Sequence, residues 1–422
     1  MNHKKKIIFT PSGQRGEFSV GTTILSAAQE LGVDLDSVCG GRGICSKCQV
    51  VPSFGTFPKF GVTVNQNALS KVNAVEIRYD EKKGLREGGR LGCQAKVLSD
   101  IVIDVPEDSQ LHKQVVRKDI TKRSLKMNPA TKLYFIEVEK PDISNPSGDA
   151  ERLKKALAEQ WGFKKLKLPT NLLSSIQKIL RAGKWTVTCA IYIKRKNSKA
   201  HILKVWPGYF EGPLLGIALD LGSTTIAANL CNLSNGEVIN SAGIMNPQIR
   251  FGEDLMSRVS YAMLNEGGTE KMTTVVREAI DNLILTISKQ NQISLDQIVE
   301  MVIVANPIMH HLLLGIDPSE LGQAPFALSI AGAINVDAEH LKLSLNENAK
   351  IYILPCIAGH VGADAAAVAL SEAPDKEQET TLIIDVGTNA EIILGNKNQV
   401  LACSSPTGPA FEGAQISCGQ RA

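Results

Sequence analysis

The stretch Cys39-Gly40-Gly41-Arg42-Gly43-Ile44-Cys45-Ser46-Lys47-Cys48 carries three cysteines in one short loop, and a fourth follows in Leu91-Gly92-Cys93-Gln94. Three thiolates from one loop and one from a distant segment are the ligand set of a 2Fe–2S cluster. The spacing C-x5-C-x2-C is one residue wider than the plant-type pattern. The glycines let the backbone wrap closely around an inorganic core. The pattern predicts a 2Fe–2S cluster held by Cys39, Cys45, Cys48 and Cys93, in a protein that transfers electrons.

Structural zinc and ordinary buried thiols are the alternatives for these four cysteines. Zinc sites usually pair short C-x2–4-C knuckles, whereas Cys93 has no second cysteine near it in the sequence. The spacing therefore favours the iron–sulfur cluster. The remaining cysteines lie mostly in apolar, strand-like runs and are expected to be reduced core residues. These are Cys189, Cys231, Cys356, Cys403 and Cys418.

The segments around the loop predict a compact N-terminal module. A strand at 5–10 and a second strand near 16–20 precede a helix at 24–31, which Gly32 ends. The cysteine loop comes next, and the chain returns as a strand after Cys48. This order of hairpin, helix, cluster loop and strand resembles the β-grasp 2Fe–2S ferredoxins. We therefore expect residues 1–104 to form a ferredoxin-type domain.

The segments that follow predict a linker and a small domain without a chemical motif. Residues 105–130 are rich in lysine and arginine but hold no interleaved aromatic residues, so they indicate a solvated tether and no nucleic-acid site. Residues 131–210 alternate strand patterns with helical patterns at 149–161 and 171–180. We expect a small α/β middle domain there.

A second motif occurs twice beyond residue 211. Apolar strands run into Asp220-Leu221-Gly222-Ser223-Thr224-Thr225 and into Asp385-Val386-Gly387-Thr388-Asn389, and each turn is followed by another strand. A glycine turn with small hydroxyls suits phosphate oxygens. An aspartate at the end of each strand can hold Mg²⁺ through water. We predict catalytic roles for Asp220 and Asp385 in a Mg–nucleotide site. The predicted phosphate cradle is Gly222, Ser223, Thr224, Gly387, Thr388 and Asn389.

This paired motif resembles the ASKHA superfamily of actin, sugar kinases and chaperone ATPases. The resemblance implies that residues 211–422 form an actin-like, ribonuclease H-like ATPase domain of mixed α/β structure. Members place an adenosine-binding motif after the second phosphate turn. Because this sequence stops soon after residue 389, we expect the domain to be incomplete at its C-terminus, which puts its independent activity in doubt.

The joining of a ferredoxin module to an ASKHA domain resembles the family of reductive activators of corrinoid proteins (RACo). Similar segments include 246–248, 251–254, 257–258, 306–315, 362–364 and 408–414. The resemblance implies ATP-dependent reduction of a corrinoid (cobalamin-binding) protein of a methyl-transfer system from Co(II) to Co(I). It implies a 2Fe–2S cluster, ATP and Mg²⁺ as cofactors and an unidentified low-potential electron donor, and it leaves room for a homodimer. An electron carrier or redox sensor with a non-catalytic scaffold and a small-molecule kinase are the alternatives.

Composition limits the setting of this chemistry. A chain of 422 residues with 43% hydrophobic and 21% charged residues predicts a multidomain globular protein of α/β and α+β class. No apolar run is long enough for a membrane span, and the first residues lack a secretory signal. We therefore expect a cytoplasmic protein that binds neither membrane nor nucleic acid.

Three further acidic or histidine features are weaker candidates. Neighbouring side chains on a helix point to different faces, so His310 and His311 are expected to be one packed and one surface histidine rather than metal or corrinoid ligands. The carboxylates of Glu391 and of the Glu253-Asp254 pair can orient an attacking water or be solvated.

Overall fold

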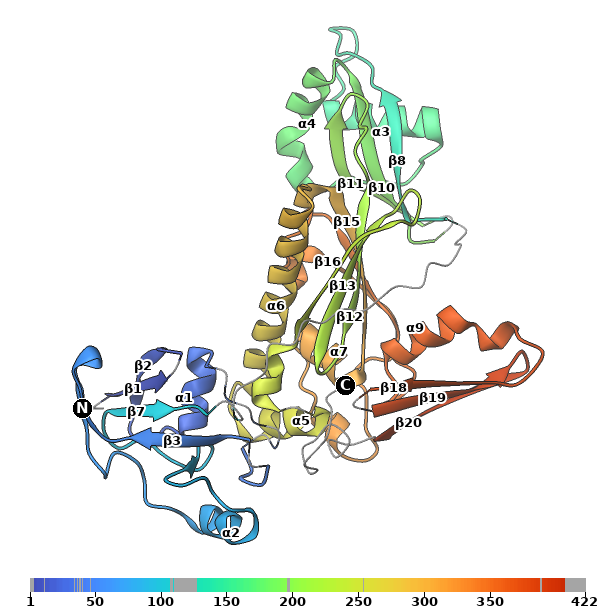
Figure 1. Ribbon diagram of the computed structural model, residues 1–422. Coiled ribbons are helices and arrows are strands. Elements are labelled where there is room, and N and C mark those ends of the chain that lie inside the picture. The colour runs from blue at the N-terminus through green and yellow to red at the C-terminus, as the bar shows by residue number, and fades with distance from the viewer. Residues whose placement is uncertain are drawn as a thin grey trace.

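The computed structural model describes residues 4–406 apart from 11, 34, 36, 38, 40, 46, 107–108, 110–126, 196–197, 253 and 388. Figure 1 shows a central sheet with a small domain above it, a second small sheet to its right and the N-terminal module to its lower left. Most of the predicted linker and all of 407–422 lie outside the described residues. None of the helices in the described part combines the length and apolar character needed to cross a bilayer.

The N-terminal module is built around a five-stranded sheet in the order β2-β1-β7-β3-β6. Its strands are β1 (Lys4–Thr10), β2 (Arg15–Ser19), β3 (Gln49–Ser53), β6 (Arg90–Leu91) and β7 (Ile101–Asp104). β1 and β2 form an antiparallel hairpin, and β7 lies parallel to β1. Buried side chains at Ile7, Ile8 and Phe9 place β1 in the centre of the core. The predicted β-grasp order is confirmed.

Helix α1 (Ile24–Leu31) packs beside this sheet, and local caps define where it begins and ends. The Thr23 side chain accepts the Ser26 backbone N–H at 3.1 Å, and Gly32 ends the helix in the left-handed conformation, with φ of 68°. A hairpin of β4 (Gly55–Phe57) and β5 (Val62–Val64) and a helix, α2 (Ala74–Lys83), separate β3 from β6. The loop that carries three of the cysteines connects α1 to β3.

The middle domain has a four-stranded sheet in the order β8-β10-β11-β9, together with two helices. The strands are β8 (Thr131–Glu137), β9 (Leu166–Lys167), β10 (Thr186–Tyr192) and β11 (Ala200–Pro207), and the helices are α3 (Asp149–Trp161) and α4 (Thr170–Ala182). Its core includes Leu153, Ile176 and Cys189. A second cluster, with Tyr192, Leu203 and Val299, joins it to the central sheet.

The central sheet has six strands in the order β14-β13-β12-β15-β17-β16. Their bounds are β12 (Leu215–Leu221), β13 (Thr225–Asn232), β14 (Val238–Met245), β15 (Ile298–Ala305), β16 (Ile334–Asp337) and β17 (Lys350–Ile353). β12, β13 and β14 are antiparallel neighbours, whereas β12, β15 and β17 run parallel. This mixed sheet is the expected ribonuclease H-like arrangement.

Helices cover the central sheet and connect it to a second sheet. The long α6 (Gly268–Gln290) packs on β13 and β14, and α5 (Leu255–Leu264), α7 (Pro307–Leu314) and α8 (Ala338–Leu341) complete the lobe. α9 (Ala363–Glu372) contacts β15 and also β19 of the second sheet. That sheet consists of β18 (Thr381–Val386), β19 (Asn389–Asn396) and β20 (Gln399–Pro406). The N-terminal module, the middle domain and the central lobe each have a core of their own, and the domain boundaries at residues 104, 130 and 210 stay a proposal.

Candidate functional site

The four predicted cluster ligands lie buried in the ferredoxin module as two facing pairs. Cys39 contacts Cys45, and Cys48 contacts Cys93. The Cys45 thiol donates to Cys39 and lowers the pKa of Cys39 to about 5, and the same bond raises the pKa of Cys45. The hydrogen bond from Cys48 likewise lowers the pKa of Cys93. Each pair therefore holds one thiol that ionises readily, and thiolate is the form that binds metal.

The paired arrangement fits a two-iron cluster better than a single ion. A 2Fe–2S cluster takes two thiolates on each iron, whereas structural zinc needs four ligands directed at one point. The four cysteines would therefore suit a two-iron cluster, with each of the two contacting pairs able to supply two thiolates.

Glycines allow the cysteine loop to run closely under α2. Gly41 and Gly43 adopt φ of +92° and +72°, and a Cβ on Gly43 would lie 2.6 Å from a Val75 side-chain carbon. Arg42 Nε also donates to the Cys39 carbonyl at 3.0 Å. A larger residue at position 43 would push the loop away from the helix. Glycine is therefore required at the last position of the sequence C-G-G-R-G for steric reasons.

Sequence reasoning missed a hydrogen-bond chain behind Cys93. Gln94 Nε2 donates to Cys93 Sγ at 3.6 Å and to the Gly41 carbonyl at 3.1 Å, and Asn73 Nδ2 donates to Gln94 Oε1 at 3.1 Å. Asn73 begins α2 in a reciprocal cap with Glu76, and the buried Glu76 pairs with Arg90 at 2.8 Å. This chain fixes the position of Cys93 and directs an N–H group at its sulfur, which is how proteins tune iron–sulfur centres.

The two predicted phosphate turns line one cavity of about 490 Å³ between the central sheet and the β18–β20 sheet. Asp220 and Asp385 both border it. So do Gly222, Ser223, Thr224, Gly387 and Asn389, whereas Thr388 lies outside the described residues. The Gly222 N–H donates to the Thr225 carbonyl at 2.9 Å, and a Cβ on Gly222 would lie 2.7 Å from that carbonyl oxygen. Glycine is therefore needed for the tight first turn.

Two more carboxylates line this cavity. Asp364 comes from the start of α9, and Glu391 lies directly opposite Asp385 in the β18–β19 pair. Burial, and then the charges of Asp220 and Asp385, raise the pKa of Asp364 to about 6. Burial, and then the charge of Asp364, raise the pKa of Glu391 to about 7. Like charges gathered at one opening attract a cation, as a Mg²⁺–phosphate site requires. The sequence reasoning assigned no role to Asp364.

These shifted carboxylates predict an unusual dependence of stability on pH. Their folded pKa values lie above the ordinary 3.8 and 4.5, so the folded state holds their protons more tightly than the unfolded chain does. The stability they contribute is complete below about pH 4 and is lost as the pH rises from there through about 6 to 7. We expect the double variant Asp364→Asn, Glu391→Gln to melt at a higher temperature than wild type at pH 8 and to exceed it by a clearly smaller margin at pH 5. Thermal unfolding monitored by circular dichroism measures this difference.

The matched control for this prediction is Glu379→Gln, which removes an exposed carboxylate outside the cavity. It should leave the melting temperature unchanged at both pH values. A double variant that is as stable as wild type at pH 8 would show that the four carboxylates do not repel one another in the folded chain.

A buried arginine holds the first phosphate turn from behind. Arg258 is fully buried; its Nη2 donates to the Ser223 carbonyl, and its Nε donates to the Gly252 carbonyl at 2.8 Å. Asn246 Nδ2 donates to the Gly222 carbonyl at 2.8 Å. Sequence reasoning placed these residues in family-like segments without a role. Together they fix the backbone of the turn, which favours a preorganised phosphate site.

The remaining acidic and histidine candidates have structural roles. The Asp254 side chain caps α5 by accepting the Ser257 N–H at 2.7 Å, and Glu253 lies outside the described residues. The prediction of one surface histidine is wrong, because both His310 and His311 are buried. His311 Nε2 accepts the Ser329 N–H at 3.0 Å, so a following segment covers this face of α7. Burial lowers the pKa of His310 to about 4, which keeps it neutral.

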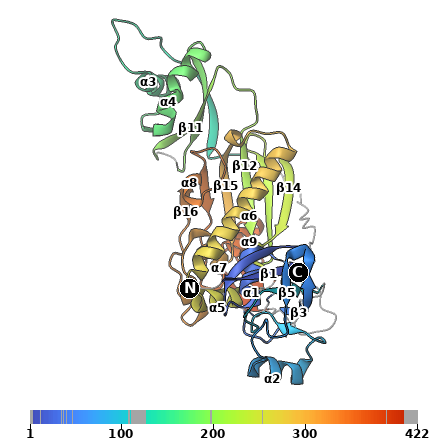
Figure 2. The same ribbon diagram turned by 90° about the vertical axis from the view of Figure 1, so that its left-hand side faces the viewer.

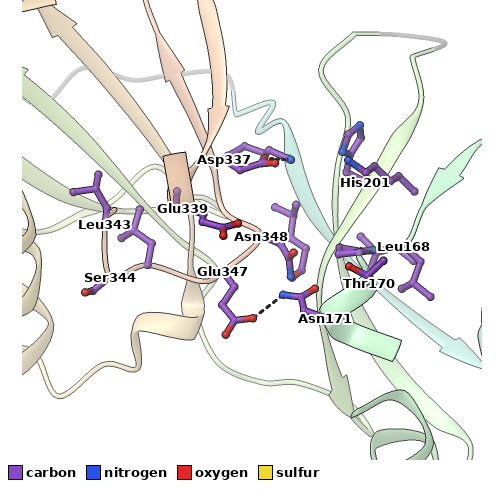
Figure 3. Close-up of a pocket in the computed structure, with 17 residues that line it drawn as sticks. Leu168, Thr170, Asn171, His201, Asp337, Glu339, Leu343, Ser344, Glu347 and Asn348 are labelled. Carbon is purple, nitrogen blue, oxygen red and sulfur yellow. Dashed lines mark hydrogen bonds and ion pairs between the residues drawn. The ribbon is translucent and has the colours of Figure 1, made fainter. Parts of the chain in front are cut away.

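A larger cavity of about 900 Å³ lies elsewhere, between the middle domain and the central sheet. Figure 3 shows Asn171 reaching across it to Glu347, with a 2.6 Å hydrogen bond. His201 lines the side of the middle domain, and Asp337 pairs with Lys350 on the other side. None of the predicted site residues lines this cavity, and its cross-links indicate a junction that holds two domains together.

The fold and the two sites define a ferredoxin domain joined to an ASKHA domain, and comparisons with known proteins give the family. The model of the 2Fe-2S iron-sulfur cluster binding domain matches residues 9–98. Models of the RACo linker region, the RACo middle region and the C-terminal ASKHA domain of RACo match 120–212, 215–377 and 379–422. The chain belongs to the RACo family.

Individual relatives agree with this assignment. The corrinoid activation enzyme RamQ of Eubacterium limosum is 26% identical over 99% of this chain and 63% of its own length. The Co(II) methylated amine-specific corrinoid protein reductase of Methanosarcina barkeri is 28% identical over 50% of this chain and 39% of its own. A solved reductive activator for a corrinoid, iron–sulfur protein superposes with a TM-score of 0.64 at 29% identity, over 99% of this chain and 65% of that one. The chain thus spans slightly under two thirds of the length of RamQ and of the solved activator, and it matches 39% of the reductase.

Proposed function

We propose that the chain carries the electron-transfer and nucleotide-binding functions of an ATP-dependent reductive activator of a corrinoid protein. The observation that supports this most is the presence, in one RACo-family chain, of two facing thiol pairs and a carboxylate-lined cavity between two phosphate turns. Two of its relatives are a corrinoid activation enzyme and a reductase of a Co(II) corrinoid protein.

One electron would pass through the ferredoxin module in each activation of the corrinoid protein. Cys39, Cys45, Cys48 and Cys93 would hold a 2Fe–2S cluster, which would supply one-electron transfer from a low-potential donor to Co(II), giving Co(I). The Gln94 amide, which donates to the Cys93 sulfur, would tune that centre. Plant-type clusters have potentials near −400 mV. Each 59 mV of mismatch with the acceptor costs about tenfold in the equilibrium constant of a one-electron transfer.

The ASKHA domain would use ATP as the source of free energy for an electron transfer that is otherwise unfavourable. Asp220 and Asp385 border the cavity from opposite sheets and would hold hydrated Mg²⁺. The backbone of both turns and the Ser223 and Thr224 hydroxyls would contact phosphate. Glu391, with its raised pKa, would accept a proton from an attacking water. The nucleotide can favour one conformation of the protein only if it binds that conformation more tightly than the other.

We place this activity in the cytoplasm.

The test is reduction of a Co(II) corrinoid protein by the reduced chain with and without MgATP. Loss of the Co(II) electron paramagnetic resonance signal measures the reaction. We expect reduction to need both the cluster and MgATP, and ATP hydrolysis to rise when the corrinoid protein is present. Reduction that is independent of MgATP would favour an electron carrier with a non-catalytic scaffold. A phosphorylated small product in place of reduced cobalt would favour a kinase.

A further inference from the structure

The ferredoxin module contacts the ASKHA lobe at a short 3-10 helix, η3 (Pro247–Phe251), which lies between β14 and α5. Gln29 of α1 donates from Nε2 to the Arg250 carbonyl at 2.5 Å. Figures 1 and 2 both show α1 beside the lower end of α6 and the adjoining α5. Gln29 is 9% exposed. A buried amide without a partner is costly, so this hydrogen bond gives the contact a defined position.

The Arg250 side chain adds an electrostatic contribution to the same contact. The last turn of α1 contains no basic residue of its own. Arg250 Nη1 lies 3.9 Å from the position of a Cβ on Gly32, the residue that caps the C-terminal end of α1. A cation near the C-terminal end of a helix is favourable because the last carbonyls carry partial negative charge. The backbone and the side chain of Arg250 therefore both face α1.

The other end of η3 holds the first phosphate turn. Asn246 caps η3 by accepting the Gln248 N–H at 3.0 Å, and its Nδ2 donates to the Gly222 carbonyl at 2.8 Å. Gln248 Oε1 accepts from Arg258 Nη1 at 3.4 Å, and Arg258 in turn donates to the Ser223 carbonyl. All three side chains are fully buried. A displacement of η3 at Arg250 would therefore shift the backbone of Gly222 and Ser223 through these hydrogen bonds.

We propose that η3 couples docking of the ferredoxin module to occupancy of the phosphate turn. The proposal rests on the nucleotide site of the proposed function. When α1 is docked, η3 is ordered and Asn246 holds the turn in its phosphate-binding form, so docking strengthens nucleotide binding. Because coupling between two binding events is reciprocal, bound nucleotide tightens docking by the same factor. The nucleotide thereby determines how firmly the cluster-bearing module is held against the lobe.

The experiment uses the whole cluster-loaded chain and the variant Gln29→Leu, which keeps the size of the side chain and removes its donor. Amide hydrogen exchange measures docking, and calorimetric titration with MgATP measures nucleotide affinity. We expect exchange in α1 and η3 to be at least about fivefold faster in the variant and MgATP affinity about fivefold weaker, at the lower end of ordinary coupling strengths. MgATP should slow exchange in α1 of wild type but not of the variant. Cluster absorption should be unchanged.

The matched control is Glu30→Gln, at the exposed position next along α1, which should behave as wild type in both measurements. Unchanged exchange in Gln29→Leu would overturn the docking contact. Faster exchange with unchanged MgATP affinity would overturn the coupling while the contact stands. If wild type does not bind MgATP, the proposed function fails and the coupling fails with it, but exchange without nucleotide still decides whether α1 docks on η3.

Discussion

Cys93→Ala is expected to leave the purified chain without its 2Fe–2S cluster. The variant removes the thiolate that the Cys48 and Gln94 side chains both contact, and one iron would keep a single cysteine ligand. Iron and acid-labile sulfide should fall from about two of each per chain to near zero, and the red-brown colour should disappear. Elemental analysis with visible circular dichroism measures the loss. The same result is expected for Cys39, Cys45 and Cys48.

Cys403→Ala provides the control, because Cys403 is exposed on β20 in the second small sheet. It should keep full cluster content. A colourless wild-type protein that contains one zinc per chain would contradict the assignment, even if all four cysteine variants lost that metal.

Asp220→Ala and Asp385→Ala are expected to weaken Mg²⁺-dependent nucleotide binding strongly while the cluster spectrum stays intact. Each variant removes one of the two carboxylates that border the cavity from opposite sheets. Because these carboxylates would hold the ion through water, loss of either should cost about 10–100-fold in affinity, as for other outer residues of metal sites. Titration with MgATP in the presence and absence of chelator measures the effect.

Asp375→Ala is a suitable comparison, since this aspartate lies in the short 3-10 helix after α9 and does not line the cavity. Its nucleotide affinity should match wild type. Tight, Mg²⁺-dependent binding in both Asp220→Ala and Asp385→Ala would place the nucleotide elsewhere, and the two turns would then be ordinary β-turns.

The parts of the fold that could be predicted are those specified by local sequence. The Gly32 cap, the cysteine spacing and the repeated strand–Asp-x-Gly–strand pattern each depend on residues within a few positions of one another. They predicted the β-grasp order and the ASKHA class, both of which are confirmed. The repeated pattern also predicted that Asp220 and Asp385 face one site, although it says nothing about the chain between them, and both residues line one cavity.

The parts that could not be predicted depend on contacts between distant segments. Gln94 looks unremarkable in sequence until α2 places Asn73 against it. Asp364 becomes a site residue only because α9 bridges the two sheets. His311 is buried by a segment that reaches Ser329, which helical periodicity alone does not reveal. In each case the deciding partner lies many residues away, so pattern reasoning had no signal for it.

The facing thiol pairs have a consequence for handling the protein in air. Without iron, each pair already holds two sulfurs in contact, and the lowered pKa of Cys39 and of Cys93 supplies a thiolate in each. Molecular oxygen can then take two electrons from each pair and leave disulfides between Cys39 and Cys45 and between Cys48 and Cys93. Such a chain would weigh only four hydrogens less than the reduced chain, yet its four cysteines could no longer bind iron. Reconstitution would begin only once a dithiol reductant had reopened both bridges.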